Sequence, residues 1–298
     1  MSSLAVVIGG LAGVAVVGGG AAAAAAGARR EYPYLATGHA HNDYKHRWPL
    51  ESALRYGYAS VEADVVPTAP GEAPDLLVGH GRHEVAPDRT LRGGYLDPLS
   101  RRVAGFGSVH SGQSHPFQLL VELKGEPDRC YRILSDQLAP YDSMLTSYRD
   151  GVVHHGAVIV VVTGARIPYE LCAAESDRHV FCDGSLSDVE SAGLPATVVP
   201  LVSEDWSAMF GWRGRGPLPD DQRDRLRDLA DRAHEDDRKL RIWGFPGWPA
   251  RVRTAFWREF SAAGVDFLAS DNLRALHAFY RRSGGPPEPD RRTDRPTD

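Results

Sequence analysis

Histidine and carboxylate side chains gather in a few short stretches of this chain of 298 residues. The segment GHAHNDYKH, residues 38–46, holds three histidines, an asparagine and an aspartate. Glu62 and Asp64 follow in SVEADV, and Glu122 stands in LLVELKGE. Histidine exchanges protons near neutral pH, and clustered carboxylates bind hard divalent cations. Residues 38–46 therefore form a metal cluster, a catalytic loop or a polar surface turn. Which of the three they form depends on the residues elsewhere in the chain that lie next to them.

Glu62 and Asp64 are two positions apart, so on a strand both side chains point to the same face. Two like charges buried on one face are unfavourable unless a cation compensates them. Glu122 at the same level of a neighbouring strand would make three carboxylates, and an all-oxygen set favours Mg²⁺ or Ca²⁺ over zinc. Ordinary acids at an exposed strand end are the alternative. The presence of Glu122-Leu-Lys124 favours the metal site.

The elements that would position these residues are short apolar segments separated by amphipathic ones. AVIVVVTG, residues 157–164, is typical of a strand buried on both faces of a parallel sheet. Eight such segments are predicted strands, at residues 34–41, 59–66, 117–124, 157–164, 179–184, 197–203, 240–245 and 265–271. Helices are predicted at residues 49–57, 128–140, 219–239 and 250–264, the last ending at Gly264, where a C-cap belongs. Eight strands alternating with helices predict a (β/α)₈ TIM barrel, with a doubly wound sheet as the alternative.

The active site of such a barrel lies at the carboxyl ends of its strands. His39 and His41 end the first predicted strand. His80 ends LLVGH, a short strand predicted within the long insert at residues 67–115, and loops of that length are usually functional. Two histidines beside a carboxylate-bound cation suit phosphodiester cleavage, because one takes a proton from the nucleophile and the other gives one to the leaving oxygen.

The bulk composition is that of a mildly acidic globular protein. A net charge of −5 and an isoelectric point near 6.2 argue against nucleic acid as a partner. The three cysteines form no C-x-x-C pair, which argues against a structural zinc site. Cys172 and Cys182 are either a disulfide pair of an exported protein or, together with Cys130, buried thiols.

Both ends of the chain differ from the middle. Residues 4–28 carry no charge and consist largely of small and apolar residues, which predicts an export signal or an uncleaved anchor at residues 1–30. A disordered leader is the alternative. Residues 283–298 are charged and rich in proline, which predicts a disordered tail. We therefore expect a monomeric barrel at residues 31–282, secreted or anchored on the extracytoplasmic side.

The pattern HNDY…PL…SVEADV, followed by His80 in LLVGHG and by Glu122-Leu-Lys124, resembles the glycerophosphodiester phosphodiesterases and their phospholipase C-like TIM-barrel relatives. Residues 39–65 look most like a bacterial and fungal branch, the altered inheritance of mitochondria phosphodiesterase-like proteins. The resemblance covers residues 34–282. It implies a metal-dependent phosphoric diester hydrolase that acts on glycerophosphodiesters or phospholipid head groups with Mg²⁺ or Ca²⁺.

The resemblance also implies roles for single residues. His41, eight residues before Pro49, is the preferred first catalytic histidine, and His39 in GHAHN is the other candidate. His80 is similar to the second catalytic histidine. The remaining implied roles are metal ligation by Glu62, Asp64 and Glu122, and substrate binding by His39, Asn42, Lys124 and Trp243.

Two departures from the family pattern concern the substrate. Asn42 stands where the diesterases usually have arginine, so one phosphate-neutralising group is missing or comes from elsewhere. Pro49-Leu50-Glu51 replaces Pro-Glu-Asn, which removes an acidic group that assists the metal. A small-molecule or phospholipid-derived phosphodiester is still the expected substrate, with contact to a membrane surface. The alternatives are a barrel that binds lipid head groups or sugars without turnover and another metal-dependent barrel hydrolase.

Overall fold

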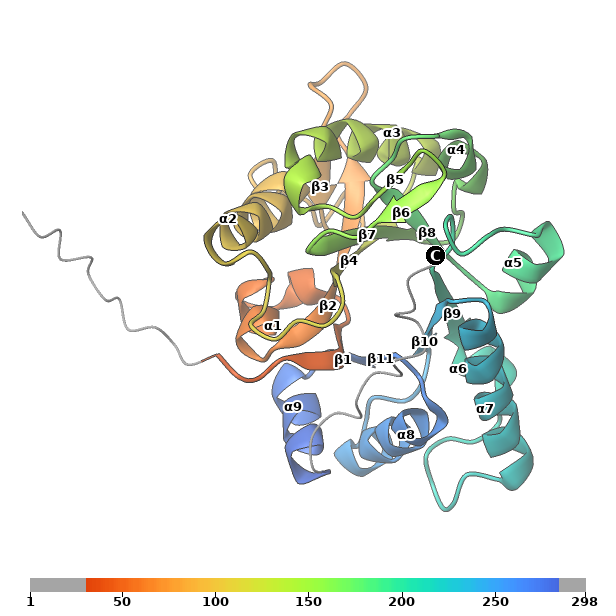
Figure 1. The fold of residues 1–298 in the computed structure, drawn as a ribbon. Helices are drawn as coiled ribbons and strands as arrows, with labels where there is room; N and C mark the ends of the chain where they lie inside the picture. Colours follow the sequence, from red (N-terminus) through yellow and green to blue (C-terminus); the bar gives the residue numbers. More distant parts are fainter. Residues whose placement is uncertain (1–30, 284–298) are drawn as a thin grey trace, which may run out of the picture. The chain divides into compact units, whose positions relative to one another are not determined.

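A closed parallel β-barrel forms the centre of the structure, a computed structural model that describes residues 31–283 (Figure 1). Its strands are β1 (Leu35–Ala40), β2 (Tyr58–Pro67), β4 (Phe117–Leu123), β7 (Val158–Thr163), β8 (Val180–Gly184), β9 (Leu201–Asp205), β10 (Lys239–Trp243) and β11 (Phe267–Ser270). They pair in the order β1-β11-β10-β9-β8-β7-β4-β2, and the parallel pairing of β1 with β2 closes the sheet. Each of them overlaps a predicted strand. The predicted TIM barrel is confirmed and the doubly wound alternative is excluded.

Helices surround the barrel and connect its strands (Figure 1). The α-helices are α1 (Glu51–Arg55), α2 (Asp97–Phe106), α3 (Pro127–Leu138), α4 (Tyr169–Ala174), α5 (Leu186–Ala192), α6 (Trp206–Met209), α7 (Asp220–Glu235), α8 (Ala250–Ala263) and α9 (Leu273–Arg282). Shorter turns are η1 (Asp43–Lys45), η2 (Arg92–Leu96) and η3 (Ala139–Met144). The four helices predicted from the sequence correspond to α1, α3, α7 and α8. Helix α8 ends as expected at Gly264, whose φ of 84° is in the left-handed region.

The long insert between β2 and β4 carries structure of its own. The predicted strand LLVGH forms β3 (Leu76–Val78), which pairs antiparallel with the end of β2. The Gly79 N–H donates to the backbone oxygen of Asp64 at 2.9 Å. This contact holds the next residue, His80, beside the carboxyl end of β2. The turn η2 and helix α2 complete the insert before β4 begins. A separate hairpin, β5 (Ser147–Arg149) with β6 (Val152–His154), precedes β7.

The barrel interior contains an apolar layer together with polar groups. Alternate residues of a strand face this interior. The apolar layer is made by Leu120, Val161, Phe181, Leu201 and Phe267. Each fully buried side chain of this size contributes about 1.5–3 kcal/mol to folding. Interior polar groups lie on either side of this layer, since Gln118 precedes Leu120 on β4 and Glu122 follows it.

Several sequence predictions concern residues that the structure describes only in part. The leader at residues 1–30 lies outside the described residues, as does the tail except for Ser283, so both stay predictions. Between residues 31 and 283, none of the helices has the length and apolar character needed to cross a bilayer. Cys130, Cys172 and Cys182 are free, buried thiols.

Candidate active site

Three carboxylates meet at the carboxyl end of the barrel. This acidic cluster consists of Glu62 and Asp64 from β2 and Glu122 from β4, and one oxygen of each lies within 4.8 Å of the other two. The strand register places Asp64 opposite Glu122, and the two-residue spacing puts Glu62 on the same face. Glu62 and Asp64 are buried and Glu122 is partly buried. The grouping predicted from the sequence is therefore confirmed.

Asp64 uses one carboxylate oxygen for the protein and leaves the other unpaired. Its Oδ2 accepts hydrogen bonds from the Tyr44 hydroxyl at 2.9 Å and from His80 Nδ1 at 2.7 Å. Lys124 Nζ lies 3.4 Å from the same oxygen. Its Oδ1 is buried without a hydrogen-bond partner among residues 31–283. A buried oxygen without a partner costs free energy, so it marks a place where a ligand belongs.

The other two acids divide their oxygens in the same way. Glu62 Oε2 accepts hydrogen bonds from His39 Nε2 at 3.1 Å and from Arg241 Nη1 at 3.0 Å. Glu122 Oε1 lies 2.5 Å from Lys124 Nζ. Within the described part of the chain, the second oxygen of each has no hydrogen bond. A cation held by three carboxylates needs this arrangement, with one oxygen oriented by the protein and one available as ligand.

The surrounding charges keep Glu62 ionised. Burial by itself would raise the pKa of its carboxyl group. The hydrogen bond from His39 and the guanidinium of Arg241 outweigh burial and lower this pKa to about 2. The carboxylate is therefore charged at neutral pH, as a metal ligand must be.

The cluster carries more negative than positive charge. Asp183 on β8 is also buried, and its Oδ2 lies 3.8 Å from Arg241 Nη2. The acidic cluster and Asp183 thus make four carboxylates, facing only two permanent cations, Arg241 and Lys124. Burial raises the pKa of Glu122, and the charges of Asp64 and Glu62 add to this effect against the opposing effect of Lys124. A divalent cation would neutralise the two remaining negative charges, so the residues present fit the predicted metal.

His41 lies on one side of the cluster, directly after β1. Its Nδ1 is 2.7 Å from Asp271 Oδ1, and its Nε2 is 3.9 Å from Glu62 Oε1. Burial lowers the pKa of this imidazole, but Asp271 and Glu62 together raise it above its usual value. A proton on Nδ1 that is donated to Asp271 leaves Nε2 facing the cluster. The side chain is 35 % exposed, so a ligand can reach it.

His80 is the second histidine at the cluster, two residues after the end of β3. Its Nδ1 bonds to Asp64, and 53 % of its side chain is exposed. Its backbone N–H donates to Glu84 Oε2 at 3.1 Å, which fixes the start of the following loop. The two histidines thus lie beside different acids of β2, His41 beside Glu62 and His80 beside Asp64. They supply the two groups that general base and general acid catalysis needs at one site.

The comparison with known proteins identifies the family of this chain. Residues 34–183, from β1 to β8, match the AIM6-like phosphodiesterase domain. The chain belongs to the AIM6-like phosphodiesterase family. Altered inheritance of mitochondria protein 6 of Eremothecium gossypii is 31 % identical over 285 residues, which cover 84 % of this chain and 71 % of that protein. The homologue from Arthroderma benhamiae is 27 % identical over 81 % of this chain and 83 % of its own.

A solved structure is also similar. It is a Ca²⁺-dependent phosphatidylinositol-specific phospholipase C from Streptomyces antibioticus. The match has a TM-score of 0.48 and 16 % sequence identity, and it covers 84 % of this chain and 96 % of the other.

In this member of the AIM6-like family, His39 lies behind the acidic cluster. It is completely buried, and its Nδ1 lies 2.8 Å from Ser60 Oγ while its Nε2 bonds to Glu62. Burial lowers its pKa to about 4, so the ring is neutral at physiological pH. The resemblance implied a substrate-facing position for His39. The structure places it differently, because β1 buries its ring beside Glu62 and leaves none of its surface for a ligand.

The other predicted substrate-binding residues lie at the carboxyl end of the barrel. Asn42 follows His41 in the left-handed conformation, with φ of 50°, and its Oδ1 accepts a hydrogen bond from Tyr44. Lys124 bridges Glu122 and Asp64. Burial lowers the pKa of its ammonium group, but the two carboxylates outweigh burial and raise it. Trp243 ends β10 with 43 % of its surface exposed.

Three residues at the site were not predicted to act there. Arg241 stands between Leu240 and Ile242, which face outward from the barrel. Because side chains alternate along a strand, the sequence could have predicted an interior position for Arg241. Asp271 follows the last strand and therefore lies at the carboxyl end. Tyr44 is buried, as expected for an aromatic residue under the first loop, but its hydroxyl contacts Asp64. The contact between Tyr44 and Asp64 follows from the structure and not from the sequence pattern.

Replacing Arg241 by methionine is expected to destabilise the metal-free protein by about 3–5 kcal/mol, because Glu62 and Asp183 would remain buried without their shared cation. Urea unfolding in EDTA at pH 7 measures this change. Arg241→Lys keeps the charge and should lose clearly less stability. Equal losses in both variants would contradict the electrostatic origin of the effect.

Asp43 supports the loop that carries His41. Its Oδ2 accepts hydrogen bonds from the Leu50 backbone N–H at 2.5 Å and from the Tyr95 hydroxyl at 3.0 Å. Its Oδ1 is buried without a partner among the described residues. Burial raises the pKa of this carboxyl group from 3.8 to about 7, against the effect of the two hydrogen bonds. The loop is therefore held by an acid that is only partly ionised at neutral pH.

The raised pKa of Asp43 predicts how stability depends on pH. Between about pH 4 and 7 the folded protein retains a proton that the unfolded chain releases, so the free energy of unfolding falls as pH rises. The full penalty above pH 7 is about 4 kcal/mol, at 1.36 kcal/mol per pKa unit. Asp43→Asn keeps an acceptor for Leu50 and Tyr95 without this titration. The melting temperature of Asp43→Asn minus that of wild type should therefore increase from pH 5 to pH 8. A constant difference would contradict the burial of a titrating acid.

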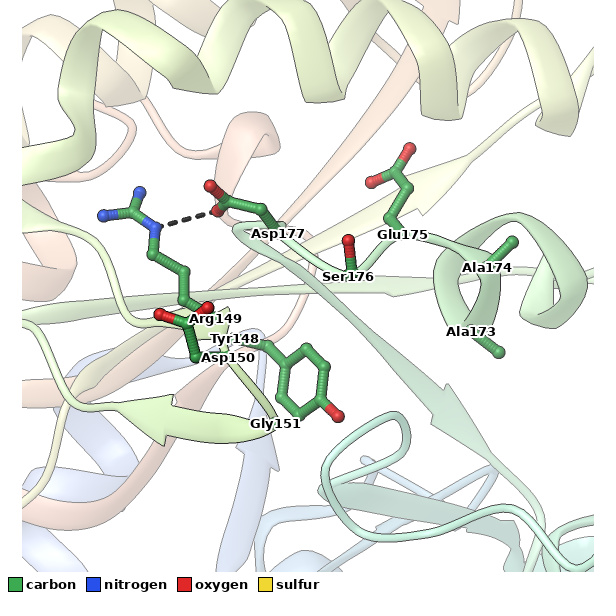
Figure 2. A pocket seen from close by; sticks show the side chains of 9 residues that line it. All are labelled: Tyr148, Arg149, Asp150, Gly151, Ala173, Ala174, Glu175, Ser176 and Asp177. Carbon is green, nitrogen blue, oxygen red and sulfur yellow. Dashed lines mark hydrogen bonds and ion pairs between the residues drawn. The ribbon is translucent and has the colours of Figure 1, made fainter.

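A separate cavity lies at the opposite end of the barrel. It has a volume of about 360 Å³ and is lined by residues 148–151 of the hairpin and residues 173–177 (Figure 2). Tyr148 pairs with Arg178, which precedes β8, so this cavity belongs to the amino-terminal side. Its Arg149 is held by ion pairs to Asp142 and Asp177. None of the predicted site residues lines it, so the candidate chemistry is confined to the carboxyl end.

Proposed function

We infer that this protein is a divalent-cation-dependent phosphoric diester hydrolase. The observation that carries the proposal is the acidic cluster, in which each acid has one oxygen held by the protein and one available, with His41 beside Glu62 and His80 beside Asp64. Membership of the AIM6-like phosphodiesterase family supports the same reaction class. The proposed substrate is a small-molecule or phospholipid-derived phosphodiester.

The proposed metal ligands are Glu62, Asp64 and Glu122. A bound Mg²⁺ or Ca²⁺ would neutralise the phosphate oxygens and the charge that develops on them. Lys124 adds a positive charge next to the same position. His39 and Arg241 hold the Glu62 carboxylate in the orientation and charge state that ligation needs, so we assign them as positioning residues.

His41 is the proposed general base. Its Nε2 takes the proton of the attacking hydroxyl, and Asp271 stabilises the imidazolium that forms. Attack by a neighbouring hydroxyl of the substrate forms a bond to phosphorus, breaks the bond to the leaving oxygen and yields a cyclic phosphate. His80 donates a proton to that leaving oxygen. If water then opens the ring, the two histidines exchange roles.

Removal of the metal tests the proposal directly. The full-length protein should hydrolyse at least one of bis-p-nitrophenyl phosphate, glycerophosphocholine, glycerophosphoinositol or a lysophospholipid in the presence of Mg²⁺ or Ca²⁺. EDTA should abolish this activity, and an excess of either ion should restore it. Activity that is indifferent to chelation would refute the role of the acidic cluster. Tight binding of these compounds without turnover would favour a binding protein.

The cellular location is a separate proposal that rests on residues 1–30. An export signal or anchor would bring the barrel to the extracytoplasmic side, where phospholipid-derived diesters and the membrane surface are accessible. Fractionation of cells that express the full chain, compared with a chain lacking residues 1–30, tests this. Equal cytoplasmic recovery of both would refute it.

A further inference from the structure

A second cavity adjoins the candidate active site on the outer side of Tyr44. It has a volume of about 540 Å³ and lies between the loop that follows β1 and the segment that follows β3. Its lining is Tyr44, Lys45, His46, Arg47, Pro49, Gly79, Glu84 and Arg89. Two of these residues join it to the site, since Tyr44 bonds to Asp64 and Gly79 immediately precedes His80. A group bound there would lie next to the reacting centre.

The lining carries three cationic side chains and one carboxylate. Within residues 31–283, neither Lys45 nor Arg47 forms an ion pair. Lys45 Nζ lies 5.4 Å from the centre of the Tyr44 ring, and the Arg47 guanidinium lies 4.5 Å from that of the Trp48 ring. The carboxylate, Glu84, is occupied by the His80 backbone N–H. Lys45 and Arg47 therefore have no carboxylate partner of their own among the described residues, as they would have if they only formed ion pairs that stabilise the fold.

Arg89 and His46 add polar atoms to the same wall. Arg89 uses one guanidinium nitrogen to donate to the Tyr44 backbone oxygen at 3.0 Å, which leaves the rest of the group available. His46 also lines the cavity, and its Nε2 is buried without a hydrogen-bond partner in the described part of the chain. Burial lowers the pKa of His46, so the ring can hydrogen-bond to a ligand without needing a charge.

We propose that this cavity is an anion subsite, formed by Lys45, Arg47, Arg89 and His46, for a second phosphate group on the substrate. Guanidinium and ammonium groups recognise phosphate through charge-assisted hydrogen bonds, and a phosphomonoester dianion matches an excess of two positive charges. The proposal rests on the proposed function and narrows its substrate class. The preferred diesters carry a phosphomonoester on the alcohol next to the scissile group.

A matched pair of substrates tests the preference. One is the p-nitrophenyl phosphodiester of glycerol, and the other is the same compound with a phosphomonoester on its terminal hydroxyl. Wild-type protein with its metal should cleave the phosphorylated compound with a kcat/KM at least about tenfold higher, as expected for one or two charge-assisted contacts. The double variant Lys45→Gln/Arg47→Gln should lose this preference and retain its activity on the unphosphorylated diester. Arg101→Gln/Arg258→Gln, an equal loss of charge at exposed positions on helices α2 and α8, should retain both.

A binding measurement separates this proposal from the proposed function. Calorimetry with the metal-free protein in EDTA compares the two diesters and inorganic phosphate. The phosphorylated diester should bind at least about tenfold more tightly than its partner, and the double variant should abolish the difference, even if neither compound is turned over. Equal affinities in wild type would overturn the subsite. Binding of inorganic phosphate that is lost in the double variant, without discrimination between the diesters, would assign the cavity to free phosphate and overturn its role in substrate choice.

Discussion

Replacing Asp64 by asparagine is expected to lower kcat/KM for phosphodiester hydrolysis by about 10³-fold, equivalent to about 4 kcal/mol of transition-state stabilisation. Asp64 has a buried, unpaired Oδ1 for the cation, while its Oδ2 gathers Tyr44, His80 and Lys124. An amide has only one oxygen, and its NH₂ group would face either the cation or these donors. The same substitution should therefore weaken metal binding and disturb the second histidine.

Two measurements distinguish this effect from misfolding. Asp64→Asn removes one of four carboxylates that face two cations, so the metal-free variant should be at least as stable as wild type. Saturating Ca²⁺ or Mg²⁺ should raise the melting temperature of wild type, since an ion that binds only the folded state stabilises it, and should not do so for the variant. Asp224→Asn, an exposed position on α7, is the matched control. An active Asp64→Asn variant would refute the carboxylate-metal assignment.

The acidic cluster could be predicted from the sequence because it depends on local rules. Side chains alternate along a strand, so the spacing of Glu62 and Asp64 placed both on one face. Parallel strands end at the same side of a barrel, so Glu122 on the next barrel strand had to lie near them. Arg241 followed the same alternation within a recognised strand and could have been assigned to the interior on that ground.

The positions of His39, His46 and Tyr44 could not be obtained in this way. His39 and His41 have the same spacing as Glu62 and Asp64, yet one is buried and the other accessible, because β1 ends between them and the chain turns at Asn42. The environment of His46 and Tyr44 depends on the segment after β3, which is distant in sequence and packs against the first loop. Periodicity carries no information about such a long-range contact.

The two histidines should differ in how their loss depends on the leaving group. His41→Ala removes the proposed base, so hydrolysis should fall by about 10²–10⁴-fold for any leaving group. His80→Ala removes the proposed acid and should cause a similar loss only for an alkoxide, such as that of glycerophosphocholine. A p-nitrophenolate anion leaves without a proton, so this variant should retain most of its activity on the p-nitrophenyl phosphodiester of glycerol, which also carries the attacking hydroxyl.

The contrast between the two leaving groups makes the assignment specific. His83→Ala is the matched control, because this histidine lies three residues from His80 with 81 % of its side chain exposed. It should leave both reactions unchanged.

If His41→Ala instead spared the p-nitrophenyl substrate, the roles of base and acid would have to be exchanged. Full activity of His41→Ala on both substrates would remove this histidine from the mechanism. The buried His39, held between Ser60 and Glu62, would then have to reorient before it could act, and a reorientation of that kind would release Glu62 from its hydrogen bond.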